Sequence, residues 1–139
     1  MRAFAEIEAE IDGITQAGLS PQDAVARLVA LGEECLEHWV VARGETPTSE
    51  QKEGFRLLAL HRQGAKGDPS FNACRETARE LAYHYNLITR EPDHPDTPKR
   101  VMLAAMVARH LCLFISGKME VAGLGEFCCS SRPLRAAGG

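Results

Sequence analysis

Apolar residues recur at three- and four-residue intervals through much of the chain, a spacing typical of helices that bury one face. The first such set predicts a helix over residues 3–16, with apolar positions at Phe4, Ile7, Ile11 and Ile14. A second helix is predicted over residues 20–43, where Ser20 is the expected N-cap and Pro21 the first helical residue. Its apolar stripe contains Val25, Leu28, Gly32, Cys35, Leu36 and Trp39.

Two further amphipathic helices follow along the chain. One is predicted over residues 49–63, because Thr48 can cap its first turn. The next is predicted over residues 70–88, with Asp68 or Ser70 as its N-cap. A loop rich in glycine and proline separates the two helices, and a second proline-rich loop ends the later one.

The stretch VMLAAMVARHLCLFI, residues 101–115, has apolar side chains at every position except Arg109 and His110. It predicts a helix over residues 99–116 that Gly117 can end. A helix with no polar face is typical of the centre of a domain or of a dimer interface. Adjacent residues on a helix lie about 100° apart around its axis, so Arg109 and His110 face different surroundings. We expect Arg109 to be paired or to reach solvent at a seam, and His110 to be structural unless His61 or His84 lies beside it.

These elements predict an all-α, single-domain bundle of four to five helices within residues 1–117, with the apolar helix at its centre. A chain of 139 residues is the usual size of one domain. Residues 118–139 are rich in glycine and fit no single period, so they are predicted to form an irregular tail. Phe127 gives this tail an apolar segment that can fold back on the bundle.

Composition and charge argue against a nucleic-acid-binding, secreted or membrane protein. The formal net charge is −3, from 16 Lys and Arg against 19 Asp and Glu, so nucleic acid is not an expected partner. The N-terminus is acidic where a secretory signal would be basic. The longest apolar run is shorter than the about 20 residues that a membrane span needs. We therefore expect a cytoplasmic protein that does not contact membranes.

The cysteines also favour a cytoplasmic protein. Their number is odd and no two have the CxxC spacing, so reduced thiols are expected rather than disulfides or a zinc ribbon; they are Cys35, Cys74, Cys112, Cys128 and Cys129. The adjacent pair Cys128 and Cys129 is the candidate for redox chemistry, because neighbouring thiols can bind soft metals or form a strained disulfide.

Histidines and cysteines on apolar helix faces are candidate metal ligands. Helical bundles build metal and haem sites from inward side chains of facing helices, and imidazole and thiolate suit zinc, iron and copper. The candidates are His61, His84, His110, Cys74 and Cys112, with Cys35 on a further stripe. Spacing places each of them on a face, and it leaves open whether they converge on one site.

The segment RELAYH, from Arg79 to His84, is similar to the arginine-and-histidine element of the HEPN family of small helical bundles, some of which are metal-independent ribonucleases. The resemblance covers these six residues. It implies that His84 would act in general acid–base transfer and that Arg79 would stabilise phosphate charge.

The leading hypothesis for function is a non-enzymatic cytoplasmic helical protein that acts through protein–protein interaction, as a homodimer that also binds a second protein. No cofactor is expected under this hypothesis. The alternative is a bundle that binds a metal ion or haem, and the further alternative is a small HEPN-like ribonuclease.

Overall fold

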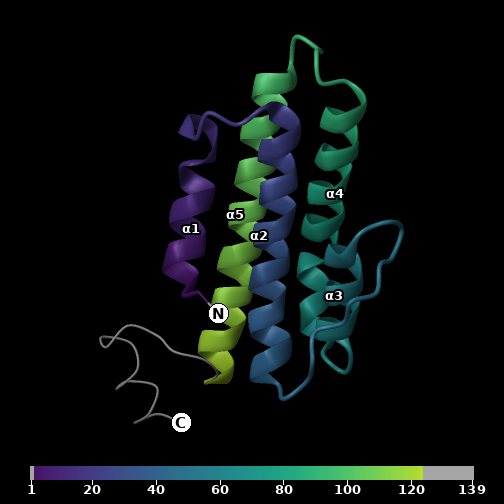
Figure 1. The fold of residues 1–139 in the computed structure, drawn as a ribbon. Helices are drawn as coiled ribbons and strands as arrows, with labels where there is room; N and C mark the ends of the chain where they lie inside the picture. Colours follow the sequence, from purple (N-terminus) through teal and green to yellow (C-terminus); the bar gives the residue numbers. More distant parts are fainter. Residues whose placement is uncertain (1, 124–139) are drawn as a thin grey trace.

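A computed structural model describes residues 2–123. This part of the chain contains five α-helices and no strand, which confirms the all-α, single-domain prediction (Figure 1). The helices are α1 (Phe4–Asp12), α2 (Pro21–Ala42), α3 (Arg56–Ala65), α4 (Arg75–Arg90) and α5 (Thr97–Ala122). Two 3₁₀ segments, η1 (Ile14–Gln16) and η2 (Pro69–Cys74), precede α2 and α4.

The two longest helices, α2 and α5, lie side by side in the middle of the bundle (Figure 1). Helix α1 packs on one side of them, α4 packs on the other side, and α3 lies between α2 and α4. The close approach of these helices is visible at Gly32 of α2, which is buried. A Cβ atom there would lie 3.1 Å from Leu57 of α3 and 3.3 Å from Leu81 of α4 and Leu111 of α5.

Helix α2 begins as its sequence predicts. The Ser20 hydroxyl oxygen accepts a hydrogen bond from the backbone N–H of Asp23 at 3.1 Å, and Pro21 is the first helical residue. Near its other end, the Trp39 indole N–H donates to the Gly64 carbonyl oxygen at 2.9 Å and thereby ties α3 to α2.

The predicted helix start at Thr48 is wrong, because α3 begins at Arg56. The Thr48 hydroxyl accepts a hydrogen bond from the N–H of Glu50, which closes a local turn instead of capping a helix. The Thr48 carbonyl accepts from the Arg56 side chain at 2.8 Å. Gly54, with a φ of 87°, then reverses the chain into α3.

Two other helix boundaries also differ from the prediction. Helix α1 ends at Asp12, and the rest of the predicted segment is the 3₁₀ turn η1. Neither Asp68 nor Ser70 caps α4, since the Ser70 hydroxyl donates to the Asp68 carboxylate at 2.6 Å. The segment after Asp68 is η2, and α4 starts only at Arg75.

Helix α5 continues past Gly117 to Ala122 and ends at Gly123, whose φ is 70°. The expected end at Gly117 is therefore wrong, and residues 118–122 are helical rather than part of an irregular tail. Tertiary contacts account for the extension: the Lys118 ammonium lies 3.0 Å from the Asp68 carboxylate, and Met119 is buried. The tail positions Phe127, Cys128 and Cys129 lie outside the described residues.

By length and composition α5 could cross a membrane, with a mean hydropathy of 1.4 over its most apolar window. In this fold its inner side packs against α1, α2 and α4 instead. Only a third of that window, 33%, is buried, so α5 carries more apolar side chains than the core uses. The absence of membrane contact remains a prediction.

Candidate functional site

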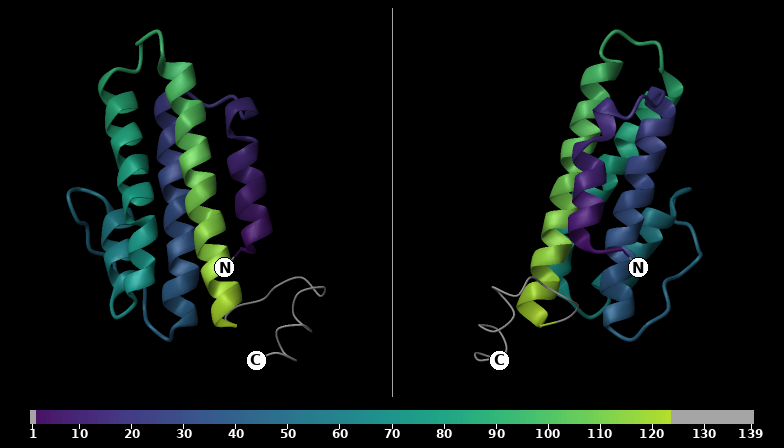
Figure 2. Two further views of the ribbon diagram at one scale, coloured as in Figure 1. Left: turned by 180° about the vertical axis from the view of Figure 1, so that it is seen from behind. Right: turned by 60° about the vertical axis from the view of Figure 1, so that its left-hand side comes forward.

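The outer side of α5 is apolar and exposed. Its exposed apolar residues lie within an arc of about 100° around the helix axis and so form one stripe, which the exposed Arg109 and His110 interrupt midway. We call this stripe the α5 face, and it consists of Met102, Leu103, Met106, Leu113, Gly117 and Val121. In the view from behind, α5 lies in front of the bundle with no helix across its outer side (Figure 2). Within the described residues, neighbouring helices therefore cover only the inner side of α5, which the sequence places at the centre of the domain or in a dimer interface.

The exposure of these side chains is large. Met106 is 62% exposed, and Met102 and Leu113 are each about half exposed. A helix that packs on a core along one side usually carries charged and polar residues along the other. Single exposed apolar residues are normal on a protein surface, whereas a contiguous apolar stripe marks a contact surface.

Arg109 lies at the edge of the α5 face that borders α1. Its guanidinium donates to the Asp12 carboxylate at 2.6 Å, and both side chains are about half exposed. Arg109 is thus paired at a seam, one of the two environments that its position predicts. The Arg109–Asp12 pair neutralises the only charge of α5 between Arg100 and Lys118.

His110 lies at the other edge, beside α4. It lines a groove of about 440 Å³ between α4 and α5 that also contains His84, Glu80 and Met106. His84 is 9% exposed, and its Nδ1 atom is buried without a hydrogen-bond partner among the described residues. Burial lowers the pKa of His84, so the neutral imidazole is favoured in the folded protein.

The other candidate metal ligands fall into two separate buried pairs. The Nε2 atom of His61 lies 3.1 Å from the Cys74 sulfur and 3.1 Å from the Phe71 carbonyl oxygen. Cys35 of α2 and Cys112 of α5 interact in the buried core. Across residues 2–123, no group of three or more His, Cys, Asp or Glu side chains is placed to hold one metal ion. The candidates therefore do not meet in a common centre in this part of the chain.

The buried thiols are poor nucleophiles. Burial raises the pKa of Cys74 to about 12, and a hydrogen bond with Cys112 together with burial raises the pKa of Cys35. A thiol with a raised pKa carries little thiolate near neutral pH. Both cysteines therefore act as packing residues in the folded protein.

Arg79 and His84, the pair that resembles the HEPN element, point to different sides of α4. Arg79 lines a cavity between α3 and α4 and lies 3.1 Å from the Glu53 carboxylate. His84 lines the groove toward α5. Residues five positions apart diverge by about 140° on a continuous helix, so the two side chains do not face one phosphate group.

Sequence reasoning missed two features of the surface. It placed this helix at the centre of the domain or in a dimer interface without separating the stripe of Met102, Met106 and Leu113 from the one that faces the core, although the lack of any polar face already indicated two apolar stripes. It also did not consider Arg75 together with Arg79. Their spacing of four residues was the available signal that they lie on one face of α4.

Comparison with known protein families, with characterised proteins and with solved structures found no match to this chain. The described residues themselves carry the evidence for function. Among them, the α5 face departs from the surface of an ordinary monomeric helical bundle.

Proposed function

We propose that this chain is a non-enzymatic cytoplasmic helical protein that acts through protein–protein contact and forms a homodimer through the α5 face. The observation that carries the proposal is the exposed apolar stripe on a helix whose opposite side already fills the core. Burying this stripe against a second copy removes apolar area from water, which is the main favourable term in association.

An antiparallel, two-fold arrangement of α5 with its copy gives self-complementary contacts. With the axis passing between Arg109 and His110, Met106 of one copy lies opposite Leu113 of the other. Met102 then lies opposite Gly117, where a Cβ atom would meet nothing within 4 Å. Met106 thus faces a side chain of similar size and Met102 faces a glycine, and each contact occurs twice, as two-fold symmetry requires.

The charges around this axis are also compatible with a second copy. An antiparallel two-fold arrangement places α1 of one copy next to α1 of the other, so two Arg109–Asp12 pairs meet near the axis. Two charges of each sign can then alternate, which avoids an unpaired charge in the interface. A stable dimer buries about 800 Å² per subunit, so the edges of α1 and α4 contribute beside the α5 face.

Free thiols support the cytoplasm as the compartment. Cys35, Cys74 and Cys112 are all reduced in the described part of the chain, although Cys35 and Cys112 are close enough for a hydrogen bond. Free cysteines of this kind are typical of proteins in a reducing environment.

The proposal is tested by measuring the mass of the protein in solution with sedimentation velocity or light scattering at micromolar concentration. The wild-type chain is expected to be a dimer. Met106→Glu should be a monomer, because a carboxylate would be buried at the centre of the stripe. Tyr83→Glu is the matched control, since Tyr83 is 59% exposed on the side of α4 toward α3, and it should remain a dimer. A monomeric wild-type chain at high micromolar concentration would overturn the proposal.

Cysteine cross-linking tests the antiparallel orientation. Met106→Cys and Leu113→Cys are prepared separately, each with Cys128 and Cys129 replaced by serine. Oxidation of the mixture should give a covalent heterodimer, and oxidation of either variant alone should give little product. Efficient cross-linking of Met106→Cys with itself would instead indicate a parallel arrangement and contradict the antiparallel one.

A further inference from the structure

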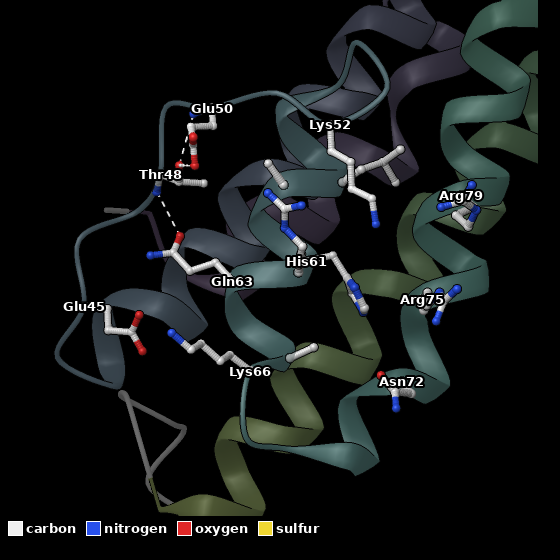
Figure 3. A pocket seen from close by; sticks show the side chains of 14 residues that line it. Glu45, Thr48, Glu50, Lys52, His61, Gln63, Lys66, Asn72, Arg75 and Arg79 are labelled. Atoms are coloured by element: carbon white, nitrogen blue, oxygen red, sulfur yellow. Dashed lines mark hydrogen bonds between the residues drawn. The ribbon is translucent and has the colours of Figure 1, made fainter.

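A second surface feature lies on the side of α4 away from the α5 face. It is a cavity of about 670 Å³ bordered by the loop after α2, by α3 and by the start of α4 (Figure 3). Its lining contains five Lys and Arg side chains, namely Lys52, Arg62, Lys66, Arg75 and Arg79. The acidic lining residues are Glu45 and Glu50. The cavity is thus rich in positive charge in a chain whose net charge is −3.

Three of these cations surround one part of the cavity. Lys52, Arg75 and Arg79 border the space between α3 and α4, with His61 on the α3 side (Figure 3). Glu45 and Glu50 lie on the other side of α3, away from these three cations (Figure 3). Opposite charges therefore do not neutralise the cluster from within the cavity.

The ion pairs of the described residues leave this cluster largely unneutralised. Neither Lys52 nor Arg75 has a hydrogen bond or ion pair from its side chain within residues 2–123. Within the same residues, the ion pair of Arg79 is with Glu53, whose side chain is 53% exposed. By contrast, Arg56 on the opposite side of α3 contacts two carboxylates, those of Glu33 and Glu37.

The positions of Arg75 and Arg79 oppose the stability of their own helix. Arg75 is the first residue of α4 and sits at the positive end of the helix dipole, and Arg79 lies one turn later. Like charges four residues apart also repel each other on a helix. Residues that lower the stability of the helix in which they lie are typical of ligand-binding positions.

The rest of the lining suits an organic molecule. His61 is 5% exposed, and its Nε2 nitrogen is held by the Phe71 carbonyl oxygen, which leaves Nδ1 as its remaining polar atom. Leu58 and Ala59 give the cavity an apolar wall. Burial lowers the pKa of His61, and the positive charges of Arg75 and Lys52 lower it further, so the field of the cations reaches the buried ring.

We propose that this cavity binds a small organic molecule carrying a phosphate group, with Lys52, Arg75 and Arg79 around the phosphate and Leu58 and Ala59 against the organic part. Phosphate fits better than a carboxylate because it offers two negative charges and several oxygens to the forked guanidinium donors. The volume lies within the range of about 300–1,000 Å³ found for small-molecule sites. This site is independent of the proposed dimer, because it uses the other side of α4.

Binding is tested with phenyl phosphate, inorganic phosphate and phenyl sulfonate added to the full chain, followed by amide chemical shifts and calorimetry. Phenyl phosphate should perturb the amides around Lys52, His61 and Arg75, inorganic phosphate should bind more weakly, and singly charged phenyl sulfonate weakest. Absence of saturable binding of phenyl phosphate at millimolar concentration would overturn the proposal. Binding of a phosphoserine peptide without binding of phenyl phosphate would also overturn it, in favour of a protein ligand.

Two matched variants test the role of the cations. Arg75→Gln should weaken phenyl phosphate binding about tenfold or more, while Arg90→Gln, at the exposed other end of α4, should leave it unchanged. Without ligand, Arg75→Gln should melt no lower than the wild-type chain, because it removes a repelled charge. Equal affinity in the two variants, or a marked loss of stability in Arg75→Gln, would contradict the assignment and indicate a structural role.

Discussion

At the scale of single residues, His84 departs most from ordinary burial, because its Nδ1 atom has no hydrogen-bond partner in the described part of the chain. A buried polar atom without a partner costs about 1–3 kcal/mol relative to one that is hydrogen-bonded. An apolar side chain of similar volume avoids this cost. We therefore expect His84→Leu to be at least as stable as the wild-type chain at pH 7.5, as measured by urea denaturation.

The same residue gives a pH dependence with a defined sign. The pKa of His84 is lowered from its ordinary value of 6.5, so the unfolded chain binds the proton more tightly than the folded one. Above pH 6.5 the residue is neutral in both states and its titration costs no stability. As the pH falls below 6.5, the unfolded chain takes up the proton first, so the free energy of unfolding decreases. The free energy of unfolding of His84→Leu should consequently decrease less between pH 7 and 5 than that of the wild-type chain. A steeper decrease in the variant would contradict a neutral, buried His84.

At the scale of elements, α1 is fastened to α2 by a cluster of charges. The Glu10 carboxylate is paired with Arg27 and lies 2.9 Å from the Arg2 guanidinium, which in turn pairs with Glu34 at 2.8 Å. The hydrogen bond from Arg27, supported by Arg2, lowers the pKa of Glu10 to about 2. The cluster therefore stabilises the docking of a short helix that buries few residues of its own.

Replacing Glu10 tests this attachment. Glu10→Gln should lower the free energy of unfolding by about 1 kcal/mol at pH 7, the upper end for partly exposed ion pairs. Because the folded pKa is below the unfolded value of 4.5, the stabilisation is present above pH 4.5 and is lost as the pH falls toward 2. The difference between variant and wild type, measured in urea, should shrink accordingly at pH 3. Glu8→Gln on the same helix is the control and should have little effect at either pH.

Gly117 of α5 gives a prediction that separates helix stability from dimer contact. It lies inside the helix, and a Cβ atom there would meet nothing within the described chain. Gly117→Ala should therefore stabilise the monomer by about 0.5–1 kcal/mol. Gly117→Leu should fill the hole that Met102 of the second copy would occupy, and should weaken the dimer in sedimentation while leaving the helix intact. Undiminished dimerisation of Gly117→Leu would contradict the proposed register.

The sequence predicted the boundaries of helices correctly where they depend on neighbouring residues in the chain. It failed where contacts between helices determine the boundary. Ser20 and Pro21 set the start of α2 through bonds to their own neighbours. Thr48 carries a similar signal, yet its carbonyl bonds to Arg56, and residues 49–55 of the expected helix form a loop. Gly117 does not end α5, because Lys118 beyond it makes an ion pair across the bundle.

At the scale of the whole molecule, periodicity indicated the faces of helices but not the neighbours of each face. It separated the environments of Arg109 and His110 correctly, because that needs only the geometry of one helix. It could not show that His61 meets Cys74 while His84 lies in a different groove, since this depends on how neighbouring helices are shifted along their axes. Helix α5 has two apolar stripes, and periodicity likewise did not indicate which of them packs against the core.

The proposed dimer couples the stability of the whole molecule to its concentration. A partner that binds only the folded state raises the melting temperature by mass action. The wild-type melting temperature should thus increase by roughly 2 °C for each tenfold increase in concentration above the dissociation constant. Met106→Glu should melt at one temperature throughout, and phenyl phosphate should raise both melting temperatures similarly, because its site lies on the other side of α4. Scanning calorimetry over a wide concentration range provides the measurement. A wild-type melting temperature that does not change with concentration would mean that the α5 face is not covered by a second copy.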